Sequence, residues 1–585
     1  MAFFERALVA RTPWAVFLTA LALSVVLFAP SIGGAFVFDD GIVIVGNPLI
    51  GGVPDVGSIF STSYHAYQPR TGLYRPLTIL SYALNAWLFG DGPVSFHVVN
   101  LVLHAGVITA VFVLVRMLST PRIAGATALL FALLPIHVEA VASIVGRAEL
   151  MMALGFLGAI IAGLSRKSFL SALLFLAGLL SKETAVAVLP VLGVMLWYRG
   201  VGMRDIAMAM RWHVAALALF LGIRIMVLGE YAFSTDASMV YNAIAHAPSW
   251  LTGVAMALRV VWEGFARVWA PFSLSSDYSY SVFSSLSWFG SLLGALIILS
   301  AILAVVRYRN TLYGYAGALF LFPLLVVANI IVPIGTIFAE RLWYIPSAGL
   351  SLLAAGVCMR MYEQWPRIVR VGGIAAIAVY AIVSFQRSGV WVSEEALFQS
   401  AFAAQPESVV NQTNMAYLDL KNERLANARS RIDAVLLKAP EHAPALNLAG
   451  AIAQRQGDYT AAEGFWKRAI QARPDYLNAY RGLGALYYDA GYFVDARAVL
   501  SDALAVYPRW SEVWYLSLVH IALGDTDAAR VLLDTHAARA VPDELTFARA
   551  LLAHAEGRTE DARALGAGIT TPRLQRALED VLPQP

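Results

Sequence analysis

Hydrophobic residues dominate the first two thirds of the chain, in long runs separated by short polar loops. A membrane-spanning helix needs about 20 mainly apolar residues, and shorter spans occur where helices are buried by their neighbours. The pattern therefore predicts an all-α, polytopic membrane domain over residues 1–391. About eleven candidate spans lie near residues 13–30, 97–115, 123–136, 148–164, 168–181, 184–198, 212–229, 288–306, 312–333, 342–358 and 371–386.

The distribution of basic residues predicts the orientation of these spans. Short cytoplasmic loops are enriched in Lys and Arg, and with the N-terminus inside, 14 of the 23 basic residues of 1–391 fall in inner loops. This holds only if residues 249–270 do not cross the membrane. Arg259, Glu263 and Arg267 recur there at four-residue spacing on an otherwise apolar helix, which is typical of a helix lying in the outer interface. The C-terminal region then lies outside.

Residues 392–585 have a different, repeating pattern. Prolines recur every 34 residues, and Gly457 and Gly491 share another position of the same period. A period of 34 residues is typical of tetratricopeptide (TPR) repeats, pairs of helices that stack into a superhelix. We expect about five repeats and a concave surface that binds extended peptides or partner domains. The prolines are Pro406, Pro440, Pro474, Pro508 and Pro542.

Composition supports a division into a membrane part and a soluble part. The chain is 59% hydrophobic and 14% charged, whereas soluble domains are about 25% charged. Residues 1–391 carry 23 basic and 15 acidic residues, and residues 392–585 carry 19 and 24. Neither balance favours nucleic-acid binding. The single cysteine, Cys358, excludes an internal disulfide framework and a Cys-rich metal site.

Charged and polar residues gather at the predicted outer ends of the spans. A charge at membrane depth is expensive and usually faces a cavity or a partner. Since these residues come from different loops on one face of the membrane, they predict a single active site at the outer interface. The alternative is interfacial snorkelling and structural ion pairing. The residues are Asp39, Asp40, Arg75, His137, Glu139, Arg147, Glu149, Lys182, Glu183, Arg224, Asp277, Glu340 and Arg341.

Several motifs carry a resemblance to a known family. In chain order they are FVFDDGIVIVGNPLI (36–50), LLFALLPIHVEAVASIVGRAEL (129–150), LLSKET (179–184), WAPFSLSSDYSYS (269–281) and FAERLWYIPSAG (338–349). Followed by TPR repeats, they resemble the transmembrane and TPR repeat-containing family of protein O-mannosyltransferases, which belongs to the membrane-embedded GT-C glycosyltransferase superfamily. The resemblance implies a polyprenyl-phosphate-linked sugar as donor and a Ser or Thr hydroxyl as acceptor.

The chemistry of such a transfer identifies candidate catalytic residues. A carboxylate must accept the proton of the attacking hydroxyl, and Asp39 or Asp40 suits this role. The resemblance places an acidic motif of GT-C enzymes in this first outer loop. Asp39 is slightly preferred, and the competing interpretation is that Asp-Asp-Gly is only a turn or a helix start.

The leaving phosphate needs cationic partners, since negative charge builds up on it. Arg341 is the first candidate, because Arg grips a phosphate with two nitrogens, although an Arg341–Glu340 structural pair is an alternative. Together with Asp277, the residues of the PIHVEA motif are expected to shape the sugar pocket. They could also hold a divalent metal, but their spacing matches no known metal-binding motif. Since relatives in the family are also thought not to need a metal, we predict none. The donor-site candidates are Arg341, Arg224, Arg147, Lys182, His137, Glu139, Asp277 and Tyr344.

The sequence therefore predicts an enzyme that transfers a sugar, mannose or another hexose, to proteins on the extracytoplasmic side, with the acceptor protein bound by the TPR repeats. The setting would be a bacterial inner membrane with periplasmic repeats, or the endoplasmic reticulum membrane in a eukaryote. One alternative is a glycosyltransferase for a lipid or glycan acceptor, and another is a non-catalytic TPR membrane scaffold. A transporter is less compatible, because transport sites lie near the bilayer midplane.

Overall fold

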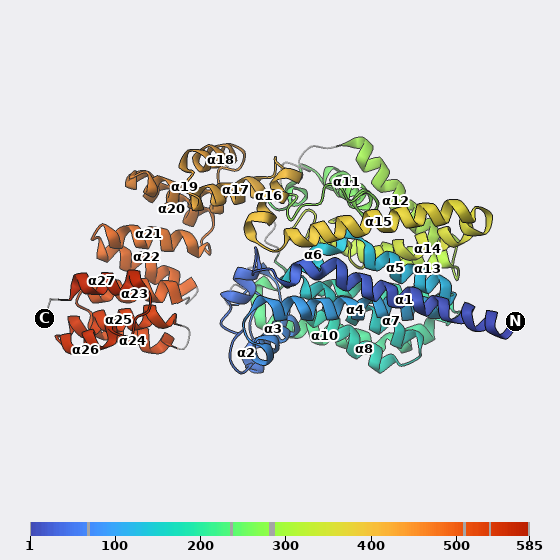
Figure 1. Cartoon of the computed structure of the whole chain (residues 1–585), viewed down its shortest axis with the longest axis horizontal. Coiled ribbons are helices and arrows are strands. Elements are labelled where there is room, and N and C mark those ends of the chain that lie inside the picture. Colours follow the sequence, from blue (N-terminus) through green and yellow to red (C-terminus); the bar gives the residue numbers. More distant parts are fainter. Residues whose placement is uncertain are drawn as a thin grey trace. The chain divides into compact units, whose positions relative to one another are not determined.

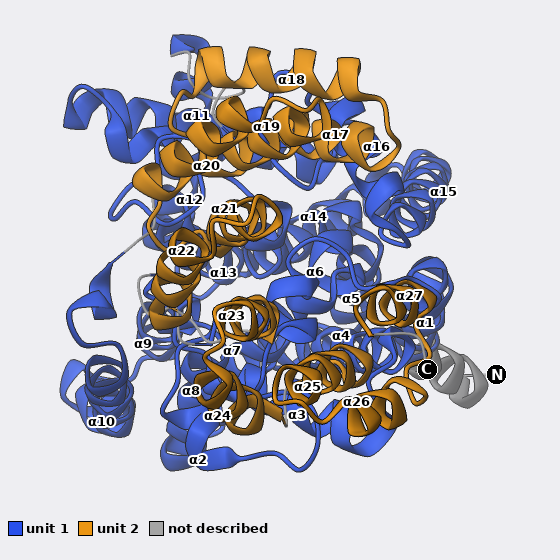
Figure 2. Cartoon of the chain, turned by 90° about the vertical axis from the view of Figure 1, so that its left-hand side faces the viewer, with its two compact units in different colours: residues 1–411 blue, residues 412–585 orange. Residues whose placement is uncertain are grey.

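The computed structural model describes residues 2–66, 71–234, 238–279, 287–506, 510–537 and 540–582, and of residues 2–12 it describes only the backbone. These residues form helices and connecting loops without any strand (Figure 1), which confirms the all-α prediction. The chain divides into two compact units, residues 1–411 and 412–585 (Figure 2). Pro508, one of the prolines of the predicted repeats, lies outside the described residues.

Unit 1 consists of long apolar helices with short helices at their ends. In the described residues, six helices are long and apolar enough to cross a membrane, or seven if one bent pair counts as a single span. The predicted number of about eleven spans stays a prediction. The six are Pro13–Ile32, Pro93–Leu118, Ile144–Leu164, Met203–Phe233, Trp288–Arg307 and Pro366–Val390, and the bent pair is Pro121–Leu133 with Pro135–Ala142.

The other predicted spans coincide with shorter helices or with a long helix of lower hydropathy. The main helices of unit 1 are α1 (Ala2–Ile32), α4 (Pro93–Leu118), α5 (Pro121–Leu133), α7 (Arg147–Leu164), α8 (Ser168–Ser181), α9 (Val188–Tyr198), α10 (Met203–Leu228), α11 (Trp250–Trp269), α12 (Trp288–Arg307), α13 (Leu312–Val327), α14 (Pro346–Gln364) and α15 (Pro366–Val390). The helix predicted to lie in the interface is α11. Its Glu263 pairs with Arg267 at 2.7 Å and approaches Arg259 at 3.9 Å, as the four-residue spacing requires.

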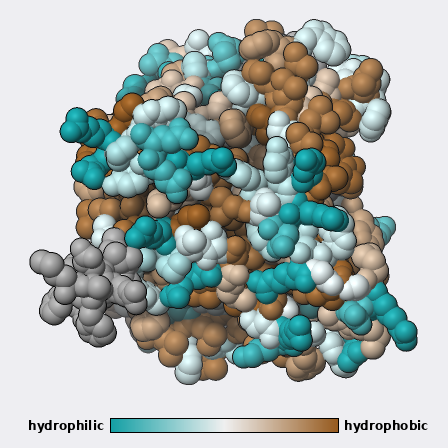
Figure 3. All heavy atoms as spheres, turned by 90° about the vertical axis from the view of Figure 1, so that its right-hand side faces the viewer, coloured by the Kyte–Doolittle hydropathy of each residue, from teal (hydrophilic) through white to brown (hydrophobic). Residues whose placement is uncertain are grey.

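Small residues allow the helices of unit 1 to approach closely. One example is the contact of α7 with α8, where a methyl group on Gly155 would lie 2.7 Å from the backbone of Gly178. Such close backbone approach is the usual packing mode of helices in membranes. At the end of unit 1 where α1 begins, hydrophilic side chains spread across the face and hydrophobic ones border it (Figure 3).

Short helices, and the loops that adjoin them, carry many of the predicted site residues. Their position follows from proline and glycine, which interrupt the long helices there; Pro135, for example, ends α5 and begins the next turn. The short elements are η1 (Gly41–Val45), α2 (Val56–Phe60), α3 (Pro76–Phe89), η3 (Pro135–His137), α6 (Val138–Ala142), η4 (Ile144–Gly146), η5 (Glu183–Ala187), η6 (Gly229–Phe233), η7 (Ala243–His246) and η8 (Glu340–Trp343).

Unit 2 consists of paired helices that follow the 34-residue period. The turns between paired helices use Gly457, Gly491, Gly524 and Gly557, all with φ between 78° and 83°, a conformation that favours glycine. Glu423 takes the same position in the first pair with φ 58°. The helices are α17 (Val409–Lys421), α18 (Leu425–Lys438), α19 (Ala443–Arg455), α20 (Tyr459–Ala472), α21 (Leu477–Asp489), α22 (Phe493–Val506), α23 (Trp510–Ala522), α24 (Thr526–His536), α25 (Pro542–Ala555), α26 (Thr559–Gly566) and α27 (Pro572–Val581).

The division between the units lies twenty residues after the predicted position at 391/392. Helix α16 (Glu394–Ala404) belongs to unit 1. The N–H of Ala35 donates to the carbonyl of Val392 at 2.9 Å, and Arg387 of α15 donates to the hydroxyl of Ser400 at 3.3 Å. Hydropathy falls at residue 392, but the polar helix that follows packs on the loops of unit 1, and a hydropathy profile does not record such contacts.

Candidate active site

The site begins at the turn that follows α1. Phe38 has φ 56°, a left-handed conformation that is rare for a bulky residue and is found where surrounding structure enforces it. The turn continues because the carbonyl of Asp39 accepts the N–H groups of Ile42 and Val43 at 3.1 and 3.0 Å. The two aspartates are thereby held at the start of η1, in a loop rather than inside a span.

The two aspartates have different surroundings. The Asp40 carboxylate is fully buried and accepts the N–H groups of Val37 and Val145, both at 3.0 Å. Burial raises the pKa of Asp40 to about 7, although these two hydrogen bonds lower it. Asp40 therefore ties the loop after α1 to η4, and each of its two carboxylate oxygens already accepts a hydrogen bond.

The Asp39 carboxylate, in contrast, forms no hydrogen bond to the described part of the chain. It is partly exposed and lies within electrostatic range of Arg341, Glu139 and Asp277. Burial raises the pKa of Asp39; Arg341 lowers it, and the two acidic neighbours raise it further. A partly exposed carboxylate with a raised pKa beside a cation is suited to accept a proton.

Arg341 pairs with Glu139, and the two residues join η8 to α6. The backbone N–H of Arg341 donates to Oε2 of Glu139 at 2.9 Å, and its guanidinium donates to Oε1. The Arg341 side chain is 32% exposed, whereas that of Glu139 is 1% exposed. The alternative pairing of Arg341 with Glu340 is wrong. Neighbouring residues of a short 3₁₀ helix point in different directions, and Glu340 faces Arg387 instead, at 3.6 Å.

A second set of ion pairs lies next to Arg341. Lys182 pairs with the buried Glu149, and Lys182 is within electrostatic range of Arg75 and Arg341. Arg75 in turn donates two hydrogen bonds to Glu183, at 2.7 and 3.1 Å. Cationic groups of three different loops thus lie within electrostatic range of Lys182 or Asp39, and Arg341 is within range of both. The location of these groups on the outer face stays a prediction.

Two of the predicted phosphate ligands are used differently. Arg147 is fully buried and donates to the side chains of Asn100 and Asn85 and to the carbonyls of Ser81 and Phe96. Arg224 donates to the carbonyls of Ala232 and Gly72, at 2.7 and 2.6 Å. Since both guanidinium groups are engaged with protein acceptors, we leave Arg147 and Arg224 out of the proposed donor site.

His137 and Tyr344 belong to a buried cluster. They lie two residues before Glu139 and three residues after Arg341 in the sequence. The ring of His137 contacts the hydroxyl of Ser347 at 2.7 Å, and Tyr344 contacts Nδ1 of His104 at 2.6 Å. The His137 and Tyr344 rings pack 4.6 Å apart. Both residues are fully buried, so they support the site from within and do not line its surface.

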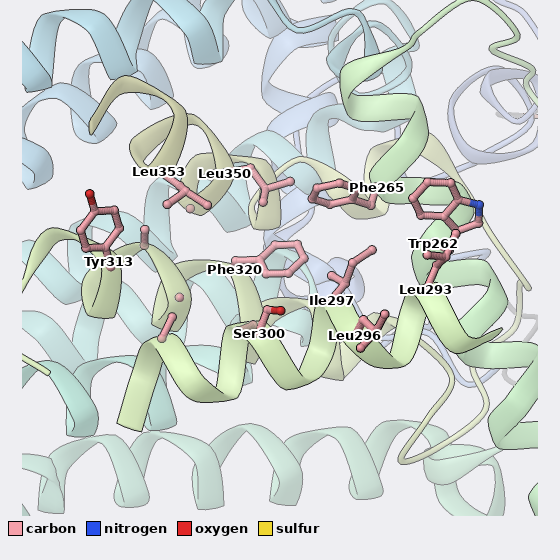
Figure 4. A pocket seen from close by; sticks show the side chains of 15 residues that line it. Trp262, Phe265, Leu293, Leu296, Ile297, Ser300, Tyr313, Phe320, Leu350 and Leu353 are labelled. Atoms are coloured by element: carbon pink, nitrogen blue, oxygen red, sulfur yellow. The ribbon is translucent and has the colours of Figure 1, made fainter. Parts of the chain in front are cut away.

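An apolar cavity of about 330 Å³ lies between α11, α12, α13 and α14. Figure 4 shows Trp262, Phe265, Ile297, Phe320 and Leu353 around it, with Ser300 as a small polar residue. The ring of Phe320 packs 6.1 Å from that of Trp343, two residues after Arg341. The cavity therefore lies close to η8, the short helix that contains the partly exposed Arg341.

Comparisons with known proteins agree with the motifs. A family model described as tetratricopeptide repeat matches residues 453–518. A protein O-mannosyl-transferase of Caenorhabditis elegans is 28% identical over 425 residues, which cover 68% of this chain and 59% of the relative. Protein O-mannosyl-transferase TMTC4 of Homo sapiens is 27% identical, covering 66% of this chain and 61% of that protein. The resemblance predicted from the motifs is confirmed.

The chain spans about three fifths of the length of these curated relatives. Among solved structures, a thermophilic TPR protein of Thermus thermophilus matches with a TM-score of 0.26 and 24% identity, over 30% of this chain and 98% of that chain.

Several residues near the site escaped sequence reasoning. His104 and Ser347 are neutral residues within apolar helices, and only their partners show that they support His137 and Tyr344. Ser408 lies in the predicted soluble half, yet its hydroxyl donates to Asp277 at 2.8 Å. Among the described residues, no three or more His, Cys, Asp or Glu side chains are grouped to hold a metal ion. The absence of a metal requirement stays a prediction.

Replacing Arg147 by methionine should destabilise the protein without acting on the donor. The change leaves buried acceptors of Asn85, Asn100, Ser81 and Phe96 without their donor, at about 1–3 kcal/mol for each unsatisfied group. The melting temperature in detergent should fall clearly. The matched control is Arg122→Met at an exposed position, which should melt like the wild type. An unchanged melting temperature combined with lost donor binding would make Arg147 a phosphate ligand after all.

Proposed function

We propose that this protein transfers a hexose, mannose by analogy with the names of its relatives, from a polyprenyl-phosphate donor to Ser or Thr hydroxyls of proteins. One observation carries the proposal. The carboxylate of Asp39, without a hydrogen-bond partner in the described chain, lies within electrostatic range of the partly exposed Arg341. A base for the acceptor and a cation for the leaving phosphate are the two groups that this reaction needs.

The reaction would be a single displacement with inversion. The acceptor oxygen attacks the anomeric carbon while its proton passes to Asp39. The bond between the anomeric carbon and the phosphate oxygen breaks, and polyprenyl phosphate leaves with the bonding electrons. Arg341 offsets the negative charge that builds up on the phosphate, and Asp39 afterwards returns its proton to water.

The surrounding ion pairs suit a site that binds an anion reversibly. Lys182 and Arg75 are each neutralised by a glutamate, Glu149 and Glu183, so their net effect on a phosphate is small. Arg341 is also paired, but a third of its side chain is exposed while its partner Glu139 is buried. The outer nitrogens of Arg341 are therefore the first to meet an incoming phosphate.

The hydrocarbon chain of the donor would occupy the apolar cavity between α11, α12, α13 and α14. Its lining is almost entirely apolar or aromatic, and burial of apolar surface stabilises a hydrocarbon by about 0.8 kcal/mol per methylene group. The position of the cavity next to Trp343 would leave the phosphate close to Arg341.

Filling this cavity should weaken donor binding. Ser300→Trp places an indole among the lining residues, whereas Leu299→Trp adds the same group at a neighbouring, 59% exposed position of α12. We expect the first variant to raise the KM for a long-chain polyprenyl donor by about tenfold, since about 1.4 kcal/mol of lost binding corresponds to that factor. The control should leave KM unchanged. Equal KM values for both variants would place the chain elsewhere.

The setting that we propose follows from the basic loops. With the basic loops in the cytoplasm, the site would face the periplasm in a bacterium or the lumen of the endoplasmic reticulum in a eukaryote. The TPR unit would lie on the same side and bind the acceptor protein, since TPR arrays present a concave binding surface.

The decisive experiment reconstitutes the purified full chain in vesicles with polyprenyl-phosphate mannose labelled in the sugar. A Ser- and Thr-containing peptide and a lipid extract are offered together. Label on the peptide, located by mass spectrometry on a hydroxyl side chain, supports the proposal. Label only on a lipid or glycan would support the alternative acceptor, and no transfer with any hexose donor would favour a scaffold.

A further inference from the structure

The segment 405–411, which leads into the repeats, is joined by hydrogen bonds to the loop that carries Asp277. The hydroxyl of Ser408 donates to Oδ1 of Asp277 at 2.8 Å. The hydroxyls of Ser408 and Ser279 are 2.9 Å apart, and the N–H of Ser279 donates to the same Oδ1 at 2.8 Å. Ser408 is fully buried, so these contacts are protected from competition by water.

A second residue of the segment holds the backbone of the same loop. The Asn411 amide lies 3.5 Å from the carbonyl of Asp277 and donates to the carbonyls of Ala401 and Gln405, both at 3.1 Å. On its other side, the loop is fixed by the N–H of Ser275, which donates to Glu340 at 2.7 Å. The position of Asp277 is therefore set within unit 1 from two sides, by Glu340 and by the segment 405–411 at the end of this unit.

These bonds leave one oxygen of Asp277 available to the site. Oδ1 accepts the hydrogen bonds from Ser279 and Ser408, and Oδ2 has no partner within the described residues. The carboxylate lies within electrostatic range of Asp39 and Glu139. A carboxylate oxygen beside the catalytic base is suited to accept a hydrogen bond from a sugar hydroxyl.

We propose that Ser408 is a positioning residue, which holds the Asp277 carboxylate against the donor sugar and so makes the segment 405–411, at the end of unit 1, a part of the active site. This inference rests on the proposed function.

If Ser408 positions Asp277, its hydroxyl should also affect the pKa of the Asp277 carboxyl. Burial raises the pKa of Asp277, and the hydrogen bonds from Ser279 and Ser408 lower it. The titratable groups that face it are Asp39 and Glu139, both of which disfavour a second negative charge when ionised. Without the Ser408 hydroxyl, the pKa of Asp277 should rise, and the ionised form that binds the sugar should be lost at a higher pH.

A purely structural role is also available to Ser408, because its oxygen accepts the N–H of Asn411 at 3.2 Å and so caps α17. Loss of a cap lowers stability but does not shift a pH profile. The matched pair Ser408→Thr and Ser408→Val separates the two roles, since both residues have the same shape and only threonine keeps the hydroxyl.

The test measures kcat, KM for labelled polyprenyl-phosphate mannose and the pH profile of transfer in the full chain. Ser408→Val should lower kcat/KM by about tenfold and move the acidic limb to higher pH, while Ser408→Thr restores both. Asp277→Asn should lower kcat/KM at all pH values, and Ser501→Ala, at an exposed site on α22, should change nothing.

Two results would overturn the inference. One is a wild-type pH profile and kcat/KM in folded Ser408→Val while Asp277→Asn is impaired. The other is an equal loss in Ser408→Thr and Ser408→Val that follows their melting temperatures. Failure of the wild-type chain to transfer any sugar would instead contradict the proposed function itself.

Discussion

Replacing Asp39 by asparagine should lower sugar transfer by about 10²- to 10⁴-fold while the protein stays folded, because general-base catalysis contributes this much and the side chain keeps its size. The Asp39 carboxylate makes no hydrogen bond to the described residues, so its loss leaves no buried donor unsatisfied. The measurement is initial transfer rate per folded molecule, with the melting temperature recorded in parallel.

The pH dependence gives a second test of the same residue. A base works only when deprotonated, so transfer should fall as the pH drops through the pKa of Asp39. Burial raises this pKa from its ordinary value of 3.8, and the acidic limb should therefore lie above the ordinary value. In Asp39→Asn, the remaining activity should lack this limb.

Asp40→Asn is the matched control. Its carboxylate accepts two backbone N–H groups, and an amide can accept only through its oxygen. The variant should lose about 1–3 kcal/mol of stability and transfer less because less of it is folded. If folded Asp40→Asn were inactive and Asp39→Asn active, the assignment of the two aspartates would have to be reversed.

Removing the Arg341 cation should have the second-largest effect. Arg341→Gln should lower kcat by about 10²- to 10³-fold, which is the usual loss when one group that stabilises transition-state charge is removed. The variant also leaves Glu139, 1% exposed, without its ion-pair partner, and breaking such a pair from one side is destabilising.

The double variant Arg341→Gln with Glu139→Gln separates catalysis from stability. It removes the uncompensated carboxylate, so the melting temperature should return towards that of the wild type while transfer stays low. Binding of polyprenyl phosphate, measured with the purified protein in detergent, should weaken in both variants. A double variant that transfers sugar at the wild-type rate would exclude Arg341 as the phosphate ligand.

Hydropathy and periodicity predicted much of the fold. The apolar runs locate the long helices, and the spacing of prolines and glycines locates the TPR turns, because both are local properties of the sequence. The tail of unit 1 was not predictable in this way. Helix α16 is polar enough to be assigned to the soluble part. Its place in unit 1 depends on hydrogen bonds that Ala35, Arg387 and Ser275 donate to Val392, Ser400 and Ala401.

The meeting of Asp39, Glu139, Asp277 and Arg341 could be predicted, since loops on one face of a membrane share a thin layer. Which of these side chains pair with one another could not be predicted. Sequence position gives the depth of a side chain in the membrane but not its direction around the helix axis. Arg147 and Arg341 are both predicted at the outer end of a span, yet Arg147 points into the core among Asn85 and Asn100, and Arg341 reaches the partly exposed site.

An experimental structure of the full chain with bound polyprenyl phosphate, the product of the proposed reaction, tests the central claim most directly. The account predicts the phosphate within hydrogen-bond distance, about 3 Å, of the Arg341 guanidinium, with the Asp39 carboxylate on the side from which the acceptor arrives and the hydrocarbon chain between α12 and α13. A phosphate bound away from Arg341, or separated from Asp39 by protein, would contradict it.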